Sequence, residues 1–475
     1  MILNKKTKIV ATIGPATESE EMLSKLLKQG LNVMRMNFSH GDFAEHQKKL
    51  DNGRGASKKT GIPLAFLQDL GGPKIRTGEF DTESGRVTIK KGQTFTLTTE
   101  KMKGDDTICH VNYEKLPAEI KVGHRIMLDD GKKKLLVTAI KGKQIVCKVI
   151  VGGELKGRRG VNLPDTDISM SSLTPKDRTD LEFGLKNKVD FIALSFVRRP
   201  SDITELRNIL KKAKSNAAII AKIETPQAVK NIDEIIELSD GVMVARGDLA
   251  IEVPAEDVPL IQKMLIQKCN QVGKPVITAT QMLESMIHSA VPTRAEVSDI
   301  ANAILDGTDA IMLSEETTLG EYPVEAVEVM SRVAMRIEND ALHEKLLNSS
   351  ERVHPNSVGE SIAAYAVRTA HKVNAKFIVS LTNSGYGARM ISRHRSQLPV
   401  LVFTPNEETY QKSIMNFGCW VFKIETYTDF QHALDEIKKA VVKNKLAKKG
   451  DKFVIAGSRP FGKQTETNMI LVETV

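Results

Sequence analysis

Three short segments in the middle of the chain end in residues that could carry out chemistry together. They are AKIET, with Lys222 and Glu224, VARGDLAIE, with Asp248, and TATQMLES, with Thr280. Each begins as an apolar, β-branched run and ends abruptly in charged or hydroxyl residues. In a barrel of parallel strands the strand ends converge on one face, where active sites lie. Two carboxylates, one ammonium and one hydroxyl gathered there indicate a metal-assisted site for a phosphate group.

Eight segments have the character of strands buried on both faces, because they are apolar or β-branched along their length. They are residues 8–14, 31–38, 64–70, 191–197, 218–224, 240–249, 275–282 and 309–316. Between them lie segments with the apolar spacing of helices, such as ESEEMLSKLLKQG, which close at a glycine. Eight alternations of strand and helix predict a (β/α)8 TIM barrel, an α/β fold.

Two parts of the chain depart from this rhythm. Residues 74–163 alternate with period two between Gly and Asp turns, which predicts a small all-β insertion, expected as a β-barrel lid domain above the catalytic face. After about residue 340, strands alternate with helices again at 377–382, 399–404, 420–425, 452–458 and 469–475. The expected domains are barrel residues 1–73 and 164–340, the lid 74–163 and a C-terminal open α/β regulatory domain 341–475, with the polar stretch 348–357 as boundary.

The composition limits the class of protein. With 475 residues, 41% hydrophobic and 27% charged, the chain fits a soluble protein of two or three domains. The net charge of +9 suits small anionic ligands, whereas aromatic residues are only 5%, so we expect no nucleic-acid partner. Four separate cysteines, the lack of a signal-peptide pattern and the lack of a membrane-length apolar run predict a cytoplasmic protein with no membrane partner.

Six motifs along the chain carry a family resemblance. They are MRMNFSHG (34–41), GGPKIRTG (71–78), AKIET (221–225), ARGDL (245–249), TATQMLESM (278–286) and PTRAEVSDIANAILDG (292–307). In this order, and over essentially the whole chain, they resemble pyruvate kinase. The resemblance implies phosphoryl transfer from phosphoenolpyruvate to ADP, giving pyruvate and ATP in the last step of glycolysis. It also implies a lid insertion, a C-terminal domain and a homotetramer.

The resemblance gives roles to the charged residues named above. Glu224 and Asp248 are expected to bind Mg²⁺, with Mn²⁺ as the alternative ion, because oxygen ligands at neighbouring strand ends suit a hard cation. Lys222 lies two residues before Glu224, on the same face of a strand, and would stabilise the phosphoryl group in flight. Arg35 is expected to hold the substrate phosphate, since a guanidinium fork matches phosphate oxygens.

The substrate carboxylate is placed by the resemblance at Gly247 and Asp248. These residues precede a predicted helical turn, whose backbone N–H groups would bind an anion. Thr280 resembles the threonine that contacts substrate and helps to deliver a proton to the enolate. A threonine hydroxyl is a poor acid by itself, so we expect a water relay.

The nucleotide side of the site is expected, by the same resemblance, to use Asn37, His40, Arg76 and Arg159. Arg159 stands where the family usually has lysine, and Arg158 is adjacent. Arginine presents a planar fork where lysine presents a point charge, so the phosphate contact would differ while the role of the lid would not.

Many members of the family bind K⁺ through residues that match Asn37, Ser39, Asp69 and the carbonyl of Leu70. Those members carry glutamate just after the proline of the Gly-Pro turn, where this chain has Lys74. A fixed ammonium can replace a monovalent cation electrostatically. We therefore expect activity without K⁺.

The segment GSRPFGKQ (457–464) is a near match to a phosphate-binding P-loop. It lacks the hydroxyl residue after lysine, contains a proline and precedes a strand, so a P-loop is excluded. The resemblance places this loop opposite a helix start, where hydroxyl and N–H groups suit a phosphate. The expected site for a phosphorylated allosteric effector consists of Thr382, Asn383, Ser384 and Gly385, with Arg459 and Lys463 as partners.

Two other classes remain open on the residues alone. A barrel lyase or aldolase that acts through a pyruvate enolate could use the same lysine and carboxylates, but it would not need Arg76 and Arg159. A basic scaffold or RNA-binding protein rests only on the net charge of +9. Nucleotide binding that survives high salt would argue against the scaffold, because binding to a phosphate backbone is strongly salt dependent.

Overall fold

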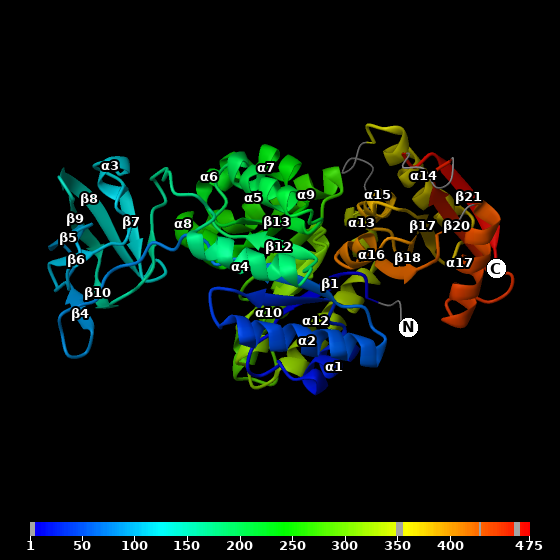
Figure 1. Ribbon diagram of the computed structural model, residues 1–475, viewed down its shortest axis with the longest axis horizontal. Coiled ribbons are helices and arrows are strands. Elements are labelled where there is room, and N and C mark those ends of the chain that lie inside the picture. The colour runs from blue at the N-terminus through cyan, green and yellow to red at the C-terminus, as the bar shows by residue number, and fades with distance from the viewer. Residues whose placement is uncertain (1–4, 348–354, 427–428, 460–465) are drawn as a thin grey trace.

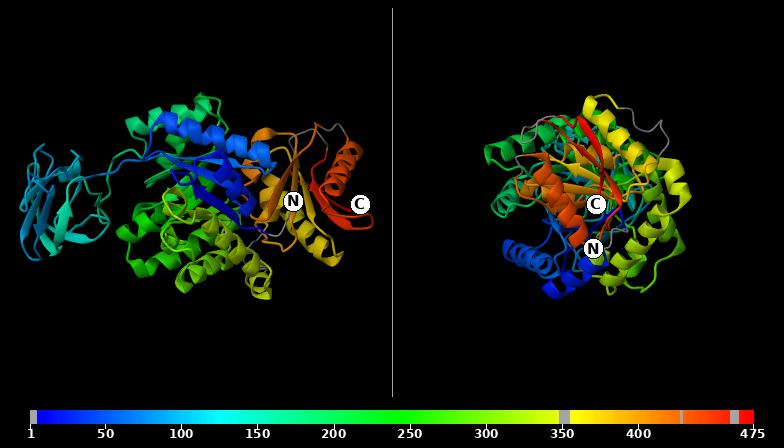
Figure 2. Two further views of the ribbon diagram at one scale, coloured as in Figure 1. Left: turned by 90° about the horizontal axis from the view of Figure 1, so that it is seen from below. Right: turned by 90° about the vertical axis from the view of Figure 1, so that its right-hand side faces the viewer.

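The computed structural model describes residues 5–347, 355–426, 429–459 and 466–475. The molecule is elongated, with a closed barrel in the middle and a smaller body at each end (Figure 1). One end is the inserted β segment, which is reached through two extended stretches of chain (Figure 2). The other end is the open C-terminal sheet. No helix in the described ranges combines the length and apolar character that crossing a membrane requires.

Eight parallel strands close into a barrel, which confirms the predicted fold. They are β1 (Lys8–Thr12), β2 (Val33–Asn37), β3 (Ala65–Asp69), β12 (Phe191–Leu194), β13 (Ala218–Ile223), β14 (Gly241–Ala245), β15 (Val276–Ala279) and β16 (Ala310–Leu313). Each strand pairs with its neighbour in the chain, and β1 closes on β16 with Lys8 opposite Ala310. The strands end before the predicted segments do, because the polar residues that follow belong to the loops of the site.

Helices alternate with the strands and cover the outside of the barrel. They are α1 (Glu20–Gln29), α2 (Phe43–Thr60), α4 (Pro175–Lys186), α5 (Pro200–Lys212), α6 (Pro226–Lys230), α7 (Ile232–Leu238), α8 (Arg246–Glu252), α9 (Val258–Val272), α10 (Arg294–Asp306), α11 (Glu315–Thr318), α12 (Pro323–Glu338) and α13 (Ala341–Leu347), with 3₁₀ turns η1 (Ala255–Asp257) and η2 (Glu284–Ile287). The sequence sets their ends. In α1, for example, the Ser19 hydroxyl accepts from the Met22 N–H, and Gly30 ends the helix with φ 113°.

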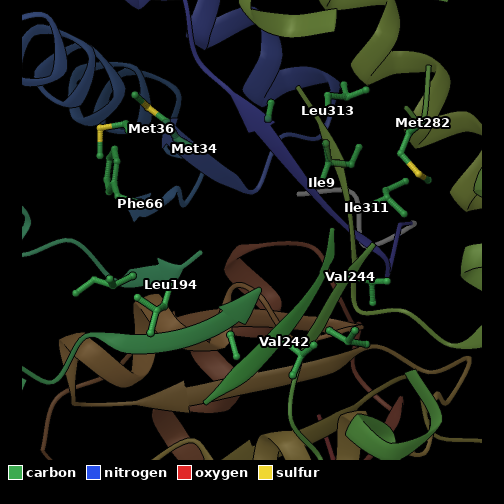
Figure 3. Packing of buried hydrophobic residues seen from close by; sticks show 14 of the residues in the cluster. Ile9, Met34, Met36, Phe66, Leu194, Val242, Val244, Met282, Ile311 and Leu313 are labelled. Carbon is green, nitrogen blue, oxygen red and sulfur yellow. The ribbon is translucent and has the colours of Figure 1, made fainter. Parts of the chain in front are cut away.

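A continuous apolar layer between strands and helices holds the barrel together. Met34 and Phe66 lie on one side of this layer and Ile311 on another (Figure 3), all buried. Because successive side chains on a strand point to opposite faces, Val10 and Leu67 fill the barrel interior instead. The barrel is therefore a packed core, and only the loops at its strand ends present groups to a ligand.

The inserted segment is a mostly antiparallel β domain, as predicted. A two-stranded sheet pairs β4 (Arg86–Ile89) with β10 (Gly153–Lys156), and a six-stranded sheet has the order β11-β7-β8-β9-β5-β6. The strands of the larger sheet are β5 (Thr94–Thr98), β6 (Ile108–His110), β7 (Arg125–Leu128), β8 (Lys133–Lys141), β9 (Gln144–Val151) and β11 (Val161–Asn162). One helical turn, α3 (Leu116–Glu119), was not predicted. The domain has its own core, which includes Phe95 and Val137.

The C-terminal domain is the predicted open α/β sheet, with strand order β19-β18-β17-β20-β21. Its strands are β17 (Ile378–Leu381), β18 (Val400–Thr404), β19 (Cys419–Lys423), β20 (Lys452–Gly457) and β21 (Met469–Thr474). Its helices are α14 (Val358–Lys372), α15 (Tyr386–Ser392), α16 (Glu407–Ser413) and α17 (Phe430–Lys443). Strand β21 returns antiparallel to β20 and forms one edge of the sheet.

A buried ion pair joins the C-terminal domain to the base of the barrel. Arg395 donates to both carboxylate oxygens of Asp309, at 3.0 and 2.8 Å, and to the Gly307 carbonyl at 2.8 Å. The same carboxylate accepts from the Phe417 N–H at 3.0 Å. The Arg395 and Asp309 side chains are only 2% and 5% exposed. Asp309 immediately precedes β16, so the C-terminal domain is fastened directly to a barrel strand.

Candidate active site

Polar side chains meet in a cavity at the carboxyl ends of the barrel strands. Arg35 comes from β2 and Lys222 from β13, and Glu224 follows β13. Asp248 lies in α8, directly after β14, and Thr280 follows β15. The structure thus brings together five predicted residues from four separate parts of the sequence.

Lys222 is buried and held by three oxygen acceptors. Its Nζ donates to Ser195 Oγ at 2.6 Å and lies 3.2 Å from Asp69 Oδ1 and 3.0 Å from Glu224 Oε1. Burial alone would lower the pKa of Lys222, but the two carboxylates outweigh burial and raise it. The side chain is therefore a permanent positive charge at neutral pH. Sequence reasoning missed Ser195, although it follows an apolar run as Thr280 does.

Asp69 joins the two cations of the site. Its Oδ2 accepts from Arg35 Nε at 2.7 Å, while Oδ1 faces Lys222. Arg35 Nη1 also donates to Thr12 Oγ1 at 2.7 Å, and Arg35 Nη2 makes no hydrogen bond to a described residue. Burial would raise the pKa of Asp69, but Lys222 and Arg35 outweigh burial and hold it below its usual value. Asp69 therefore orients both cations toward the cavity.

Glu224 and Asp248 are the carboxylates that could hold a metal ion. Glu224 Oε2 accepts from the Phe196 N–H at 2.7 Å, and Phe196 has a φ of 53°. Burial, reinforced by the negative charge of Asp248, raises the pKa of Glu224. A divalent cation shared by the two carboxylates would relieve that repulsion, so the donor set fits a hard cation. The described residues contain no cluster of three or more His, Cys, Asp or Glu side chains that would enclose a metal, so further ligands would come from substrate and water.

Gly247 and Thr280 are in direct contact. Helix α8 begins at Arg246, so Gly247 and Asp248 lie inside its first turn rather than before it. The Gly247 N–H donates to Thr280 Oγ1 at 2.8 Å, and that hydroxyl donates to the Ala279 carbonyl at 2.7 Å. The hydroxyl thus occupies the N–H group that was expected to bind a substrate carboxylate.

The backbone at Thr280 is strained. Thr280 and Gln281 have φ angles of 69° and 56°, a region that β-branched residues rarely adopt. Arg246 holds this loop, because its Nη2 donates to the Thr280 carbonyl at 2.8 Å and its Nε to the Ala279 carbonyl at 3.1 Å. Arg246 Nη1 is anchored in turn to Asp299 of α10, at 2.6 Å. Sequence reasoning missed this arginine, although it lies in the ARGDL motif.

The predicted nucleotide residues are only partly brought together. Asn37 and His40 line the cavity with the other site residues. Of the described lid residues, Lys74 lines the same cavity, whereas Arg76 and Arg159 do not. Arg76 Nη1 donates to the Arg158 carbonyl at 3.3 Å, and Arg159 Nε lies 3.3 Å from Asp129 within the lid.

A buried histidine supports the His40 loop. His46 Nε2 lies 2.9 Å from the His40 carbonyl, and its ring stacks on Phe38 with centroids 4.0 Å apart. Burial, followed by the nearby Lys49 ammonium, lowers the pKa of His46 to about 4. The imidazole is thus neutral at physiological pH, and Nε2 can donate to the carbonyl. Only the structure reveals this role, because His46 lies inside an ordinary amphipathic helix.

The residues expected to bind K⁺ already use several of their oxygens. Asn37 Oδ1 accepts from the Ser39 N–H at 3.1 Å, and the Leu70 carbonyl accepts from Ser195 Oγ at 2.7 Å. Both oxygens of Asp69 face cations. Lys74 is exposed and lines the cavity nearby.

The lid touches the barrel beside α8. Asn162 of the lid donates from Nδ2 to Glu252 Oε1 at 2.8 Å, and Gln227 Nε2 donates to the Thr166 carbonyl at 3.2 Å. Burial raises the pKa of Glu252 to about 7. Glu252 is one helical turn beyond Asp248, so this contact connects the lid to the helix that carries a predicted metal ligand.

The predicted effector residues form a tight turn before α15. Gly385 has φ 78°, and its N–H donates to Thr382 Oγ1 at 3.0 Å. The Asn383 carbonyl accepts from Thr409 Oγ1 at 2.6 Å, and Ser384 Oγ accepts weakly from the Tyr386 N–H at 3.4 Å. Arg459 exchanges two hydrogen bonds of 2.8 Å with the Asn468 side chain through its backbone. Lys463 lies outside the described residues.

Comparisons with known proteins agree over the whole chain. The pyruvate kinase barrel domain matches residues 4–327, and the pyruvate kinase alpha/beta domain matches residues 360–473. The chain is 43% identical over 479 residues to Pyruvate kinase 2 of Synechocystis sp., covering 100% of this chain and 80% of that one. It is 42% identical over 474 residues to a pyruvate kinase of Clostridium perfringens, covering 99% and 100%. The crystal structure of a pyruvate kinase from Cryptosporidium parvum is similar with a TM-score of 0.92 at 36% identity, covering 99% of this chain and 96% of that one. The chain is a phosphotransferase and belongs to the pyruvate kinase family.

Proposed function

We propose that the residues at the mouth of the barrel transfer the phosphoryl group of phosphoenolpyruvate to ADP, giving pyruvate and ATP. The observation that carries this assignment is the position of Lys222, whose ammonium is fixed between Asp69 and Glu224. Arg35 is bound to the same Asp69 carboxylate. A phosphoryl transfer asks little covalent chemistry of the protein, so catalysis depends on positioning and on charge that is oriented before the substrate arrives.

Arg35 and Lys222 divide the work on the phosphoryl group. Arg35 binds the phosphate through the free end of its guanidinium, because Nε and Nη1 already bond Asp69 and Thr12. Lys222 neutralises charge on the group in flight from a buried position, where water screens it little. The two cations act together, since one carboxylate holds both.

Glu224 and Asp248 would hold the divalent cation, Mg²⁺ or Mn²⁺. When bound, the ion supplies positive charge to the oxygens of phosphoenolpyruvate and of the transferred group. Glu224 directly follows β13 and Asp248 lies in α8, directly after β14, and these two strands pair in the barrel. Two negative charges that line one cavity and repel each other favour a site that fills with a cation.

Helix α8 binds the carboxylate of the substrate, and Thr280 acts on its enolate. A substrate carboxylate accepts from the N–H groups of the first turn of α8, including Gly247. Thr280 Oγ1 now accepts from that N–H, so the hydroxyl must turn away from it, toward the substrate. From there it can take part in a relay in which it receives a proton from a water as it passes its own toward the enolate carbon, so that the hydroxyl stays neutral.

The lid completes the nucleotide side. Asn37 and His40 line the cavity, and Arg76 and Arg159 would reach the ADP phosphates when the lid moves over the barrel. Arg159 would leave Asp129 to do so. Lys74 would take the electrostatic place of K⁺ beside Asn37, Ser39, Asp69 and the carbonyl of Leu70.

Regulation and assembly follow from the family and the C-terminal domain. The turn of Thr382, Asn383, Ser384 and Gly385 would bind a phosphorylated effector, with Arg459 and Lys463 as partners. We infer a cytoplasmic homotetramer, as the family implies. Gel filtration and the response of the substrate half-saturation to sugar phosphates test these two points separately.

The first test measures pyruvate formed from phosphoenolpyruvate and ADP with Mg²⁺, with and without KCl at constant ionic strength. Lys222→Met should lower the turnover on the order of 1,000-fold, as loss of a preorganised charge does. Lys8→Met is the matched control, because Lys8 is also buried but lies at the opposite end of the barrel. Pyruvate formation that needs no ADP would favour the lyase, and equal activity of the two variants would refute the role of Lys222.

A further inference from the structure

A basic surface lies on the C-terminal domain, at the end of the molecule opposite the lid (Figures 1 and 2). The last turns of α17 and the loop before β20 form most of it. Its five exposed lysines, none of which pairs with an acidic side chain of a described residue, are Lys376, Lys443, Lys445, Lys448 and Lys449. Unlike these, Lys438 and Lys439 at the edge are paired with Glu473 and Glu436.

The backbone holds these charges in one place. Helix α17 ends at Lys443 with Asn444 as its C-cap, and Lys445 has a φ of 56° in the turn that follows. The Lys448 N–H donates to Asp451 Oδ2 at 2.9 Å, which closes the loop as a turn. Lys445, Lys448 and Lys449 lie in this turn, Lys443 ends the helix and Lys376 comes in from the segment before β17. The nearby Asp451 carboxylate accepts from the Lys448 N–H. A surface with five exposed lysines and one carboxylate has a clear excess of positive charge, which attracts a polyanion.

An apolar side chain is exposed among the lysines, which favours a lipid bilayer over a nucleic acid as the anionic partner. Val442 is 53% exposed, whereas Leu446 and Ala447 beside it are half-buried and pack against the core of the domain. A nucleic-acid backbone would gain nothing from this side chain, and no aromatic residue lines the described surface for bases to stack on. All the cations are lysines, which act as point charges rather than bidentate forks. An exposed apolar side chain among lysines fits a bilayer with anionic headgroups.

We propose that this surface binds the face of an anionic phospholipid bilayer, a peripheral membrane partner that the sequence alone does not predict. The lysines would lie at the headgroup phosphates and carboxylates, with Val442 at the boundary of the acyl region. The barrel mouth and the lid lie toward the other end of the molecule, so the enzyme would remain accessible to its substrates while bound (Figure 1). This association is peripheral and electrostatic, and it weakens as salt rises.

Co-sedimentation of the full chain with vesicles tests the proposal. Vesicles of phosphatidylserine and phosphatidylcholine should pellet the wild-type protein, and vesicles of phosphatidylcholine alone should not. Each lysine near an anionic surface strengthens partitioning about fivefold, so K443Q/K448Q/K449Q should weaken it on the order of 100-fold. Val442→Ser should weaken it a few-fold without changing any charge. Kinase activity in solution should be unchanged in both variants, which verifies that they are folded.

The matched control removes three exposed lysines elsewhere. K211Q/K212Q/K214Q lies at the end of α5 on the barrel and lowers the net charge by the same amount. It should pellet with the vesicles as the wild type does. Equal loss in the two triple variants would assign the effect to overall charge and overturn the proposal. So would failure of the wild type to pellet, or tight binding of a homopolymeric RNA by a protein that does not bind the vesicles.

Discussion

Ser195 offers a sharp test of how the site orients its central cation. Its hydroxyl accepts from Lys222 Nζ at 2.6 Å and donates to the Leu70 carbonyl at 2.7 Å. The ammonium, the hydroxyl and the carbonyl thus form one chain of hydrogen bonds. Ser195→Ala removes this acceptor and leaves Lys222 to Asp69 and Glu224, at 3.2 and 3.0 Å. The ammonium would then shift toward the carboxylates and away from the transferred group.

The magnitude follows from the kind of bond that is lost. A hydrogen bond to a charged group contributes about 1.5–3 kcal/mol, which corresponds to roughly 10- to 150-fold in rate. The loss should fall on turnover, because Arg35, which is bound to Asp69 and Thr12, still holds the substrate phosphate. The half-saturation for phosphoenolpyruvate should therefore change by less than about threefold.

Steady-state kinetics of Ser195→Ala and Ser392→Ala give the comparison. The Ser392 hydroxyl also donates to a backbone carbonyl, that of Phe417, at 2.7 Å, but it lies in the C-terminal domain far from Lys222. Ser392→Ala should lose about 1 kcal/mol in the free energy of unfolding and Ser195→Ala somewhat more, but only Ser195→Ala should lose turnover. Equal turnover in the two variants, or a loss confined to substrate half-saturation, would refute the reasoning.

Three further predictions concern charge and pH. Lys74→Glu should make activity depend on K⁺, so that replacing tetramethylammonium chloride with KCl raises the rate of the variant but not of the wild type. Burial raises the pKa of Glu252 from 4.5 to about 7. Below pH 4.5 the carboxyl group is neutral in both states and costs no stability, whereas between pH 4.5 and 7 it ionises more readily in the unfolded chain, so the free energy of unfolding falls as pH rises. Glu252→Gln keeps an acceptor for Asn162, and urea titration should show it gaining stability relative to wild type across that window; a constant difference would contradict this. Burial lowers the pKa of His46 from 6.5 to about 4, so the wild type loses stability as pH falls through this range. His46→Asn does not titrate, and its deficit at pH 7 should shrink toward pH 4.

The fold was predictable because its signals are local. A buried parallel strand such as 218–223 is apolar throughout, and a helix such as α1 carries its own cap at Ser19 and its own stop at Gly30. Strand ends were less predictable, since ARGDL continues the apolar run of β14 into α8. The single turn of α3 left no periodic signal, because four residues are too few to show one.

The site was predictable only in part. Lys222 and Glu224 could be placed together, because residues two apart on a strand share a face. The two ion pairs that link Arg35, Asp69 and Lys222 could not be predicted, since they depend on which strands are neighbours around the barrel. Hydrogen bonds from ordinary residues, such as Ser195 to Lys222, carry no sequence signature at all.

The buried pair of Arg395 and Asp309 has a consequence for modularity. Deleting the C-terminal domain would leave Asp309 without its cation at the foot of β16, and breaking a buried ion pair costs about 3–5 kcal/mol. That is a large share of the net stability of a typical protein, about 5–15 kcal/mol. The barrel and the C-terminal domain should therefore unfold together as one cooperative unit. The lid has its own core around Phe95 and Val137, so it should fold independently and tolerate replacement by another small domain.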